Sequence, residues 1–535
     1  MGGGARGMVG VDERRRGKET ASTTKAPLTV TVPAERRSMG EFDGNESNRR
    51  WLSEGEEEVE SLGEEGRGAL LSPASVPVPL GAGVVRIGPM QVQTNSILGL
   101  GSHGTVVYRG RLHGRCVAIK RVLLEFVRVA EKEMDLLIQS DRHCAIVRYF
   151  DRASDGSFVY LALELCACNL SDLVQYKAAT LTIGSGVGRQ TREKAAGTGG
   201  GVGVHEAGGS EAGARGEAAA ASLELELRLP DSMRELVGGI AFLHALGIVH
   251  RDIKPLNILV THDSHLKISD MGLSKRLDAG QSSFETLAGT WGWRAPEQVR
   301  GERSTRSVDL FACGCVIFFS CTLGAHPFGP RASREANILA ARHDLSKLKH
   351  DPVASQLIRS LLEQEPSNRP AASALLRHPF FWNALERLEF LVDVSDHLEP
   401  LMAEEALVQD FEDRAVLVFG QGGVAVRVAG DGVGGGGSWD AFLSKELLAD
   451  LVMPAAARRK YKFDSLRDLL RAVRNKKNHF VDLPAVLQIA MGPLPHGYLA
   501  YWTDRFPALF MQVHDFVVSN ALHSEPRFLR YFGRE

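Results

Sequence analysis

The residues best suited to chemistry lie in the run Val-His-Arg-Asp-Ile-Lys-Pro-Leu-Asn that ends at Asn257. Asp252 supplies a carboxylate that can accept the proton of a hydroxyl group, and Lys254 supplies an ammonium for a phosphate oxygen. Asn257 adds an amide oxygen that can bind Mg²⁺. A base, a cation and a metal ligand at this spacing predict transfer of a phosphoryl group to a hydroxyl.

Motifs on both sides of this run complete a site for ATP and Mg²⁺. Glycines between two apolar runs let backbone amides close over phosphates, and Lys120 ends the β-branched run Val-Ala-Ile, where an ammonium can meet the α and β phosphates. Asp270, in Asp-Met-Gly, is the expected metal ligand beside Asn257. The predicted nucleotide and metal set is Leu98, Gly99, Gly101, Gly104, Val106, Ala118, Lys120, Glu133, Glu164, Cys166, Asn257 and Asp270.

The partner of Lys120 is expected to be a carboxylate on a helix. Glu133 is preferred and Glu131 competes with it, because residues two apart on a helix cannot both face the same cation. Met271 stands where such motifs usually carry Phe. Since that side chain packs rather than binds metal, we expect the change to affect the inactive state more than the chemistry.

Together these motifs predict a protein kinase of the Ser/Thr class, with Asp252 and Lys254 as catalytic residues. Ala-Pro-Glu, ending at Glu297, closes the activation segment, and Asp309 and Arg369 fit structural positions that brace the kinase C-terminal lobe. A phosphate in this segment could pair with the arginine that precedes Asp252. The hydroxyls in range are Ser282, Ser283, Thr286 and Thr290, of which the two serines are preferred.

The chain continues past the point where ordinary kinases end. His-Pro-Phe-Phe-Trp, ending at Trp382, is followed by Asp-Val-Ser-Asp, ending at Asp396, and by a cationic run from Tyr461 to Phe480. From about Ser96 to Phe532 the chain resembles the inositol-requiring kinase/endoribonucleases of the unfolded protein response and, more distantly, RNase L. The resemblance implies that a ribonuclease centre is formed by Tyr461, Arg474, Asn475 and His479.

These residue types suit RNA cleavage. RNA carries its own nucleophile, so cleavage needs a base for the 2′-OH proton, an acid for the 5′ oxygen and cations for the phosphate, without a metal. Arg458, Arg459, Lys460 and Lys462 surround Tyr461 in sequence and would favour its phenolate if they lie close in space. We therefore expect Tyr461 to act as the base and His479 as the acid.

The run from Arg458 to Lys477 holds nine Lys or Arg and two Asp, a net charge of +7, which predicts a phosphate-binding surface. A solvated basic helix face is the alternative. Asn475 and His479 stand four residues apart and share a helix face, whereas only the resemblance places Tyr461 beside them. Later aromatic residues could stack bases, although their near-helical spacing favours core packing: Tyr498, Tyr501, Trp502, Phe506 and Phe510.

The order of strand-like and helical segments, together with the resemblance, predicts an α+β fold. A two-lobed protein kinase is expected first, followed by an all-α ribonuclease domain of the KEN type. Residues 1–88 combine Gly runs with charge clusters and should be disordered. The kinase is expected over residues 90–388, with a Gly/Ala-rich insertion at 177–221. The endoribonuclease domain is expected over residues 389–535.

Length and composition limit the number of domains and the class of protein. A length of 535 residues allows two or three cores, and the formal charge of −2 argues against a protein that is basic throughout. The seven cysteines contain no Cys-x-x-Cys pair, which favours buried thiols in a reducing compartment. No apolar run is long enough for a membrane span, so we expect the chain as given to be cytoplasmic.

The resemblance also implies partners. It predicts stem-loop mRNA as substrate, the chain itself as a phosphorylation substrate, a homodimer or higher oligomer, and no DNA. Family members carry a lumenal sensor and a membrane span before the kinase, so a missing upstream span would place this part at the cytosolic face of the endoplasmic reticulum. Two alternatives stay open: an active kinase whose C-terminal module is only a dimerisation scaffold, and a nucleotide-binding pseudokinase that regulates a nuclease like RNase L.

Overall fold

The computed structural model describes most of the chain from residue 75 onward. The described ranges are residues 75–101, 104–124, 135–136, 138, 143–184, 225–277, 283, 289–420, 437–452 and 460–533. In these ranges no helix is both long enough and apolar enough to cross a bilayer.

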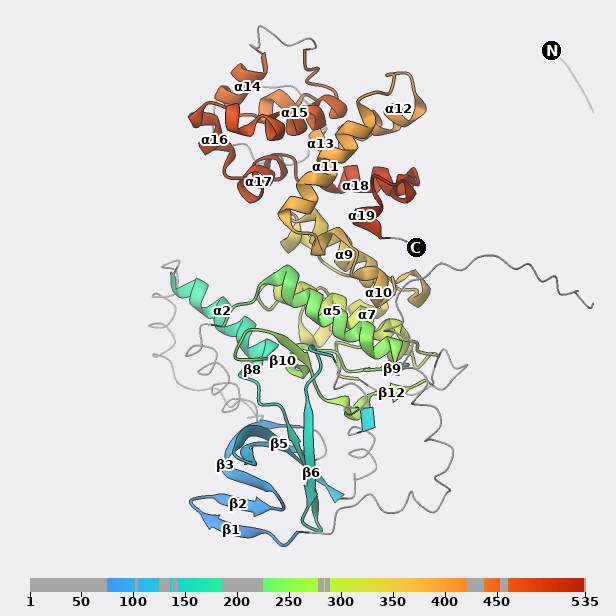
Figure 1. Cartoon of the computed structure of the whole chain (residues 1–535). Coiled ribbons are helices and arrows are strands. Elements are labelled where there is room, and N and C mark those ends of the chain that lie inside the picture. Colours follow the sequence, from blue (N-terminus) through green and yellow to red (C-terminus); the bar gives the residue numbers. More distant parts are fainter. Residues whose placement is uncertain are drawn as a thin grey trace, which may run out of the picture. The chain divides into compact units, whose positions relative to one another are not determined.

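An antiparallel sheet forms the N-terminal lobe (Figure 1). In the described residues it has seven strands in the order β1-β2-β3-β4-β5-β7-β6. Apolar side chains alternate along β5, so that Val117 and Ile119 are buried in a separate small core beneath the sheet. The strands are β1 (Val78–Gly81), β2 (Val84–Ile87), β3 (Met90–Leu100), β4 (Val106–Leu112), β5 (Arg115–Leu123), β6 (Tyr149–Ser154) and β7 (Phe158–Leu163).

The predicted disorder of residues 1–88 is wrong at its C-terminal end. Strands β1 and β2 lie inside that range, and β2 pairs with β3 from Val84 to Ile87. Ile87 is fully buried in the small core, so the pairing is stabilised by burial as well as by backbone hydrogen bonds. Only four residues long each, these strands are too short to produce a clear alternating pattern in the sequence.

Helices dominate the C-terminal lobe, which also contains two small sheets that order as β11-β10-β8 and β12-β9. The helix α7 is apolar on nearly all sides and buried, as a central core helix must be. The helices are α2 (Leu170–Gly184), α5 (Leu229–Ala245), α6 (Pro296–Arg300), α7 (Ser307–Cys321), α8 (Arg334–Leu339), α9 (Pro352–Leu361) and α10 (Ala372–Leu375). The strands are β8 (Cys168–Asn169), β9 (Ile248–Val249), β10 (Ile258–Val260), β11 (Leu266–Ile268) and β12 (Lys275–Arg276).

The predicted insertion begins too early. Helix α2 continues to Gly184, so residues 177–184 belong to a regular helix and not to a surface insertion. Ala and Leu residues after Lys177 support the helix, whereas the Gly-rich composition that suggested a loop starts only later. Residues 185–224, which make up the rest of the predicted insertion, lie outside the described ranges.

The C-terminal domain is helical in its described residues, which agrees with the predicted fold class. Its first helix starts at a capping box in which Asn383 and Glu386 exchange hydrogen bonds with each other's backbone N–H groups at 2.8 and 2.9 Å. The helices are α11 (Ala384–Leu398), α12 (Ala406–Asp413), α13 (Ala415–Phe419), α14 (Lys445–Val452), α15 (Leu466–Asn478), α16 (Ala485–Met491), α17 (His496–Arg505), α18 (Leu509–Ser519) and α19 (Leu529–Phe532).

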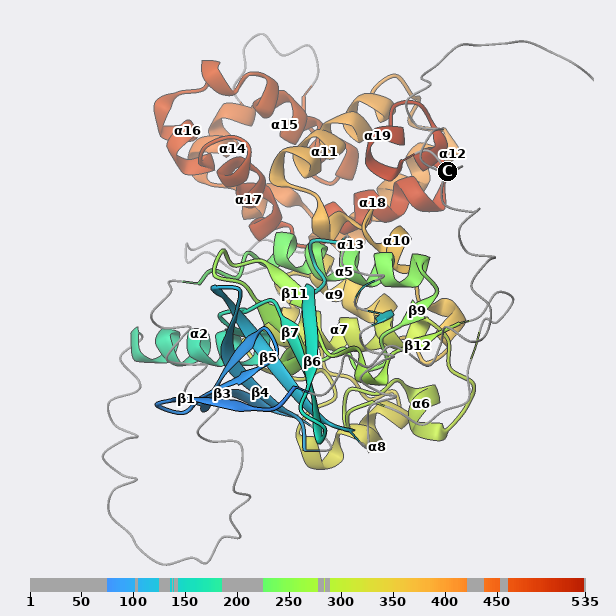
Figure 2. The same cartoon turned by 60° about the horizontal axis from the view of Figure 1, so that its bottom comes forward.

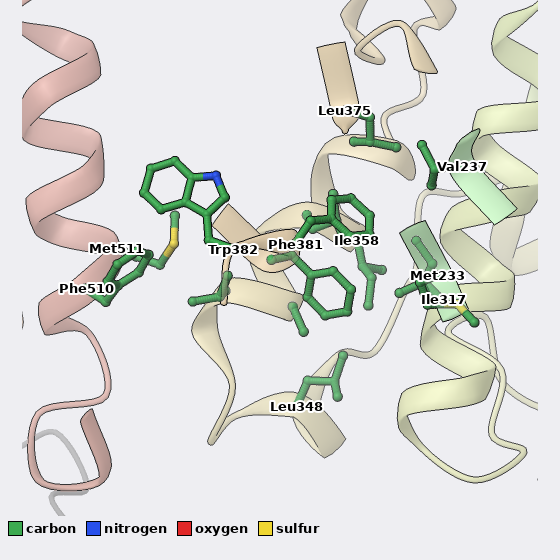
Figure 3. Close-up of a cluster of buried hydrophobic side chains, with 14 of the residues drawn as sticks. Met233, Val237, Ile317, Leu348, Ile358, Leu375, Phe381, Trp382, Phe510 and Met511 are labelled. Atoms are coloured by element: carbon green, nitrogen blue, oxygen red, sulfur yellow. The ribbon is translucent and has the colours of Figure 1, made fainter. Parts of the chain in front are cut away.

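Helix α11 joins the C-terminal lobe to the helical domain and packs against α15, α17 and α18 (Figures 1 and 2). The predicted domain boundary between residues 388 and 389 falls within this helix. Just before it, neighbouring side chains are shared between the two parts (Figure 3). Phe381 packs toward Ile358 of the lobe, and Trp382 packs toward Phe510 of α18. One hydrophobic core therefore continues from the lobe into the helical domain.

Candidate active sites

Two predicted catalytic side chains, Asp252 and Lys254, and one predicted metal ligand, Asn257, converge in the loop between β9 and β10. Lys254 Nζ binds Asp252 Oδ2 at 2.7 Å, and Asn257 Nδ2 donates to the same oxygen at 2.8 Å. A 3-10 turn, η4 (Pro255–Asn257), returns the chain so that the Asn257 amide also reaches the Asp252 backbone carbonyl at 2.9 Å. Asp252 and Asn257 are both buried.

The neighbours of Asn257 determine which way its amide is turned. Both contacts with Asp252 are to oxygens that can only accept, so the amide nitrogen must face Asp252. The amide oxygen is consequently left on the other side. It is thus free of this carboxylate and suited to a divalent cation.

Thr290 completes the arrangement around Asp252, which the sequence did not indicate. The Thr290 backbone N–H and hydroxyl donate to Asp252 Oδ1 at 2.9 and 2.6 Å, and Lys254 Nζ donates to the Thr290 hydroxyl oxygen at 2.5 Å. Gly289 before it has a φ of +108°, and a Cβ there would lie 2.9 Å from the Arg251 carbonyl oxygen. The sequence pair Gly289-Thr290 could have indicated this contact, because only glycine allows the backbone to lie so close to the Arg251 carbonyl.

A buried carboxylate holds the loop that carries Asp252. Asp309 accepts hydrogen bonds from the backbone N–H groups of His250 and Arg251 at 2.8 and 2.7 Å and lies 2.9 Å from His244 Nε2. Burial acts to raise the pKa of Asp309, but the hydrogen bond and charge of His244 and the contacts with His250 and Arg251 lower it overall. Asp309 therefore stays ionised, which confirms its predicted bracing position.

A second buried pair anchors the end of the activation segment. Arg369 forms two parallel hydrogen bonds to the Glu297 carboxylate at 2.7 and 2.8 Å, with both side chains almost completely buried. Its remaining donors reach the backbone carbonyls of Glu363, Gln364 and Ser307. Because every group is paired, the charge is tolerated in the core.

On the nucleotide side, Lys120 from β5 lies 2.9 Å from Asp270. Burial acts to raise the pKa of Asp270, but the ammonium of Lys120 lowers it overall. Asp270 precedes a 3-10 turn, η5 (Met271–Leu273), in which Met271 is fully buried, as predicted for a packing side chain. Glu133 and Glu131, the candidate partners of Lys120, lie outside the described residues.

The glycine-rich connection joins β3 to β4. Leu98 and Gly99 belong to β3 and Val106 opens β4, and the Gly101 N–H donates to the Thr105 carbonyl at 2.8 Å. Gly104 has a φ of +71°, so the turn needs a residue that accepts a left-handed conformation. The two residues between these glycines, 102 and 103, lie outside the described ranges.

The segment after β7 contains two residues predicted to bind the nucleotide, Glu164 and Cys166. The Glu164 carboxylate binds Lys267 Nζ at 2.9 Å and accepts the Arg148 N–H at 3.3 Å. The backbone N–H of Cys166 has no hydrogen-bond partner among the described residues, which fits an adenine acceptor. Burial raises the pKa of the Cys166 thiol to about 12, so it is protonated and not a nucleophile. Ala118 of β5 pairs with the last residue of β7.

In the helical domain, three of the four predicted ribonuclease residues are in direct contact. Asn475 Nδ2 lies 3.0 Å from the Tyr461 hydroxyl oxygen, and Arg474 donates to Asn475 Oδ1 at 3.3 and 3.2 Å. Tyr461 precedes α15, and the guanidinium of Arg471 lies 4.5 Å from the centre of its ring. Trp439 packs edge-on against the same ring, with the centroids 6.3 Å apart.

His479 follows α15 directly. Its backbone N–H bonds the Asn475 carbonyl at 3.1 Å, so the two residues lie one helical turn apart, as their spacing predicted. The imidazole is exposed and lies 3.5 Å from Asp482. No contact between the Tyr461 and His479 side chains is found within the described residues, and Asn475 connects them through its side chain and backbone.

The cationic run is less available to a phosphate than its net charge suggested. Arg467 is buried and donates to three backbone carbonyls at the end of α11, and Arg471 is buried beside Tyr461. Arg474 and Lys476 form ion pairs with carboxylates. Lys460 and Lys462 are exposed, whereas residues 458 and 459 lie outside the described ranges. Several of these cationic side chains therefore hold α15 against its neighbours and are not available to bind a phosphate.

The later aromatic residues belong to the core and do not form a base-stacking surface. All five are buried, as the near-helical spacing favoured: Tyr498, Tyr501, Trp502, Phe506 and Phe510. The Tyr498 hydroxyl donates to the Val473 carbonyl at 2.6 Å, so this ring supports α15 from behind.

Comparison with known proteins defines the class of both parts. The protein kinase domain family matches residues 220–381, and the Ribonuclease 2-5A family matches residues 387–532. The chain therefore combines a protein kinase domain with a helical ribonuclease-type domain. These two matches meet at the start of α11, where Phe381 and Trp382 join the cores.

Curated relatives that match most of this chain come from a plant, a slime mould and human. The serine/threonine-protein kinase/endoribonuclease IRE1b of Arabidopsis thaliana is 38% identical over 83% of this chain and 48% of its own length. The probable serine/threonine-protein kinase ireA of Dictyostelium discoideum is 35% identical over 84% of this chain and 42% of its own length. The serine/threonine-protein kinase/endoribonuclease IRE2 of Homo sapiens is 37% identical over 83% and 43%.

The chain is therefore similar to these serine/threonine-protein kinase/endoribonucleases across both of its domains. It spans about half the length of the curated relatives it matches.

Proposed function

We propose that the chain is a Ser/Thr protein kinase that phosphorylates itself and, coupled to this, a metal-independent endoribonuclease that cuts structured RNA. The kinase activity is supported above all by the contacts of Lys254 and Asn257 with Asp252. The ribonuclease activity is supported above all by the contacts of Asn475 with Arg474 and Tyr461. Both groupings bring together residue types that suit the two reactions.

In the kinase half, Asp252 accepts or orients the proton of the substrate hydroxyl. Lys254 keeps that carboxylate in place and faces the transferred phosphate, while Thr290 fixes its second oxygen. Lys120, Asn257 and Asp270 would hold ATP and Mg²⁺, which supply the phosphoryl group and neutralise its charge. The family's use of ATP and a divalent metal supports this assignment.

In the ribonuclease half, Tyr461 takes the proton of the 2′-OH and His479 protonates the 5′ oxygen. The 2′ oxygen bonds to phosphorus as the bond to the 5′ oxygen breaks, which leaves a 2′,3′-cyclic phosphate. The amide nitrogen of Asn475 donates to the Tyr461 oxygen at 3.0 Å and so fixes the position of that oxygen. The exposed imidazole of His479 is accessible to an RNA strand.

A cleavage assay in EDTA tests the ribonuclease half. We expect the purified chain to cut a stem-loop RNA without divalent metal, and His479→Ala to lose about 10²- to 10⁴-fold in rate. His496→Ala, which changes an exposed histidine on α17, is the matched control and should cut at the wild-type rate. Failure of the wild-type chain to cut would leave the C-terminal domain as a dimerisation scaffold, and equal rates for His479→Ala and wild type would reject His479 as the acid.

Transfer of labelled phosphate tests the kinase half. The wild-type chain should label itself with ATP and Mg²⁺, and Asp252→Ala should abolish labelling. If the two chains bind ATP equally but neither transfers phosphate, the pseudokinase alternative replaces the proposal.

The proposed partners rest on the same similarity to serine/threonine-protein kinase/endoribonucleases. We propose stem-loop mRNA as the RNA substrate in the unfolded protein response, a homodimer or higher oligomer as the active assembly, and the activation segment as the site of self-phosphorylation. Ser283 is described, whereas Ser282 and Thr286 lie outside the described residues. We further propose that this part of the protein acts at the cytosolic face of the endoplasmic reticulum.

A further inference from the structure

The side chain of Arg474 is almost entirely occupied by contacts with its own protein. Its guanidinium lies 3.0 Å from Asp396 and 3.2 Å from Glu399, and it also reaches the Ser395 carbonyl at 3.4 Å. Only 12% of the side chain is exposed, against 44% for Asp396 and 39% for Glu399. Two carboxylates thus enclose one cation, which leaves little of its charge for an RNA phosphate.

The remaining donors of Arg474 fix the amide of Asn475. Its Nε and Nη2 both contact Asn475 Oδ1, at 3.3 and 3.2 Å. An arginine can only donate, so the amide oxygen must face it and the amide nitrogen must face the other way. That nitrogen lies 3.0 Å from the Tyr461 hydroxyl oxygen, which therefore accepts the hydrogen bond.

The two carboxylates and the residues that they hold lie on different helices. Asp396 belongs to α11 and Glu399 ends it, whereas Arg474 and Asn475 belong to α15. The chain of contacts runs from α11 through the guanidinium and the amide to the phenolic oxygen. Rotation of Arg474 would release the amide, which could then flip and place its oxygen against Tyr461.

We propose that Asp396 and Glu399 are positioning residues of the ribonuclease centre, holding Arg474 so that Asn475 presents its amide nitrogen to Tyr461. This inference rests on the ribonuclease activity proposed above. It assigns Arg474 chiefly to the orientation of Asn475, and it makes the end of α11 part of the support of the site.

Single-turnover cleavage of a stem-loop RNA in EDTA tests the inference, with RNA affinity and thermal stability measured on the same proteins. The variants are Asp396→Asn, Glu399→Gln and the pair combined, which keep the side-chain shapes. Glu389→Gln is the matched control, because Glu389 also lies on α11, is 35% exposed and pairs with an arginine at 3.2 Å, but that arginine is Arg530.

We expect each single change to slow cleavage about 10-fold and the pair to slow it more than either single change but less than about 100-fold. RNA affinity and melting temperature should be unchanged, because a misplaced base slows chemistry without weakening binding. Glu389→Gln should cleave at the wild-type rate. In an Arg474→Lys background, Asp396→Asn should add less than about threefold, since residues of one network do not act independently.

Two results would overturn the positioning role. One is wild-type cleavage by the combined variant; the other is tighter RNA binding with unchanged or faster cleavage, which would mean that the carboxylates only compete with phosphate for Arg474. If the wild-type chain itself does not cut RNA, the proposed ribonuclease activity fails instead.

Discussion

Two asparagines present their amide nitrogens to the two proposed bases. Asn257 faces Asp252 because its contacts there are all acceptors, and Asn475 faces Tyr461 because Arg474 occupies its oxygen. In both cases the neighbour can only accept, as Asp252 does, or only donate, as Arg474 does. It therefore determines which of the two possible orientations the asparagine amide adopts. Each proposed base is thereby held in place by an amide donor.

The hydroxyl of Thr290 gives a prediction for the kinase reaction. Thr290→Val keeps the shape but removes the hydrogen bond to Asp252 Oδ1, and with it the bridge to Lys254. We expect self-phosphorylation to slow by about 10- to 100-fold, because the carboxylate loses its fixed orientation. The rate of labelled phosphate transfer at saturating ATP measures the effect.

Thr290→Ser retains the hydroxyl and is the control. It should transfer phosphate within about threefold of wild type, since the backbone and hydroxyl contacts can both persist. Equal rates for Thr290→Val and Thr290→Ser would show that this hydroxyl does not orient Asp252.

Helix α15 carries Arg474 and Asn475 of the proposed ribonuclease centre and is held at its start by a carboxylate from α12. Glu412 accepts from the Ser465 hydroxyl at 2.6 Å and from the Leu466 N–H at 2.7 Å. Backbone N–H groups at a helix start lack partners within the helix, and the helix dipole favours an anion there. Buried leucines along one face complete the attachment of the helix.

Removal of this cap should destabilise the helical domain. We expect Glu412→Ala to lower the free energy of unfolding by about 1–2 kcal/mol, as loss of a helix cap does. Asp413→Ala, which removes the exposed carboxylate of the next residue, should cost less than about 0.5 kcal/mol. Denaturant unfolding of the two variants compares the costs, and equal costs would contradict the capping role.

A single hydrophobic core extends across the kinase lobe and the ribonuclease domain, with Trp382 at the junction. Trp382 packs against Phe390, Phe510 and Tyr531, with ring centroids 5.2, 6.1 and 5.3 Å apart. Nearby, His378 accepts the Phe380 N–H through Nδ1. Because the two parts share this packing, we expect them to unfold together.

This junction should make stability depend on pH. Burial, with the charges of His514 and Arg387, lowers the pKa of His378 from 6.5 to about 3, so the folded protein resists its protonation. An unfolded chain protonates it near pH 6.5, so the stabilisation is present above that pH and is lost progressively as pH falls toward 3. Between pH 6.5 and pH 5 the loss is at most about 2 kcal/mol.

Unfolding by denaturant at pH 7 and pH 5 measures the loss. His378→Asn, which keeps an acceptor near Nδ1 but does not titrate, should reduce the difference between the two values. His326 contributes in the same direction, because burial also lowers its pKa to about 3. A pH dependence that is identical in the His378→Asn variant would reject the assignment to His378.

Short-range spacing determined the parts of both sites that the sequence predicted well. Asp252, Lys254 and Asn257 are separated by one tight turn, and Asn475 and His479 by one helical turn, so local backbone geometry brings them together. Hydrophobic patterning also separated a mixed lobe from a helical domain. These features depend on residues close in the chain.

Packing between distant segments decided the rest. Thr290 reaches Asp252 across 38 residues, and Asp396 reaches Arg474 across 78, distances over which no periodicity carries information. The sequence likewise could not tell that Arg467 and Arg471 turn inward, because charge alone does not say whether a cation finds buried acceptors. The sequence determined which chemical groups are present, and the tertiary structure decided which of them hold the others in place.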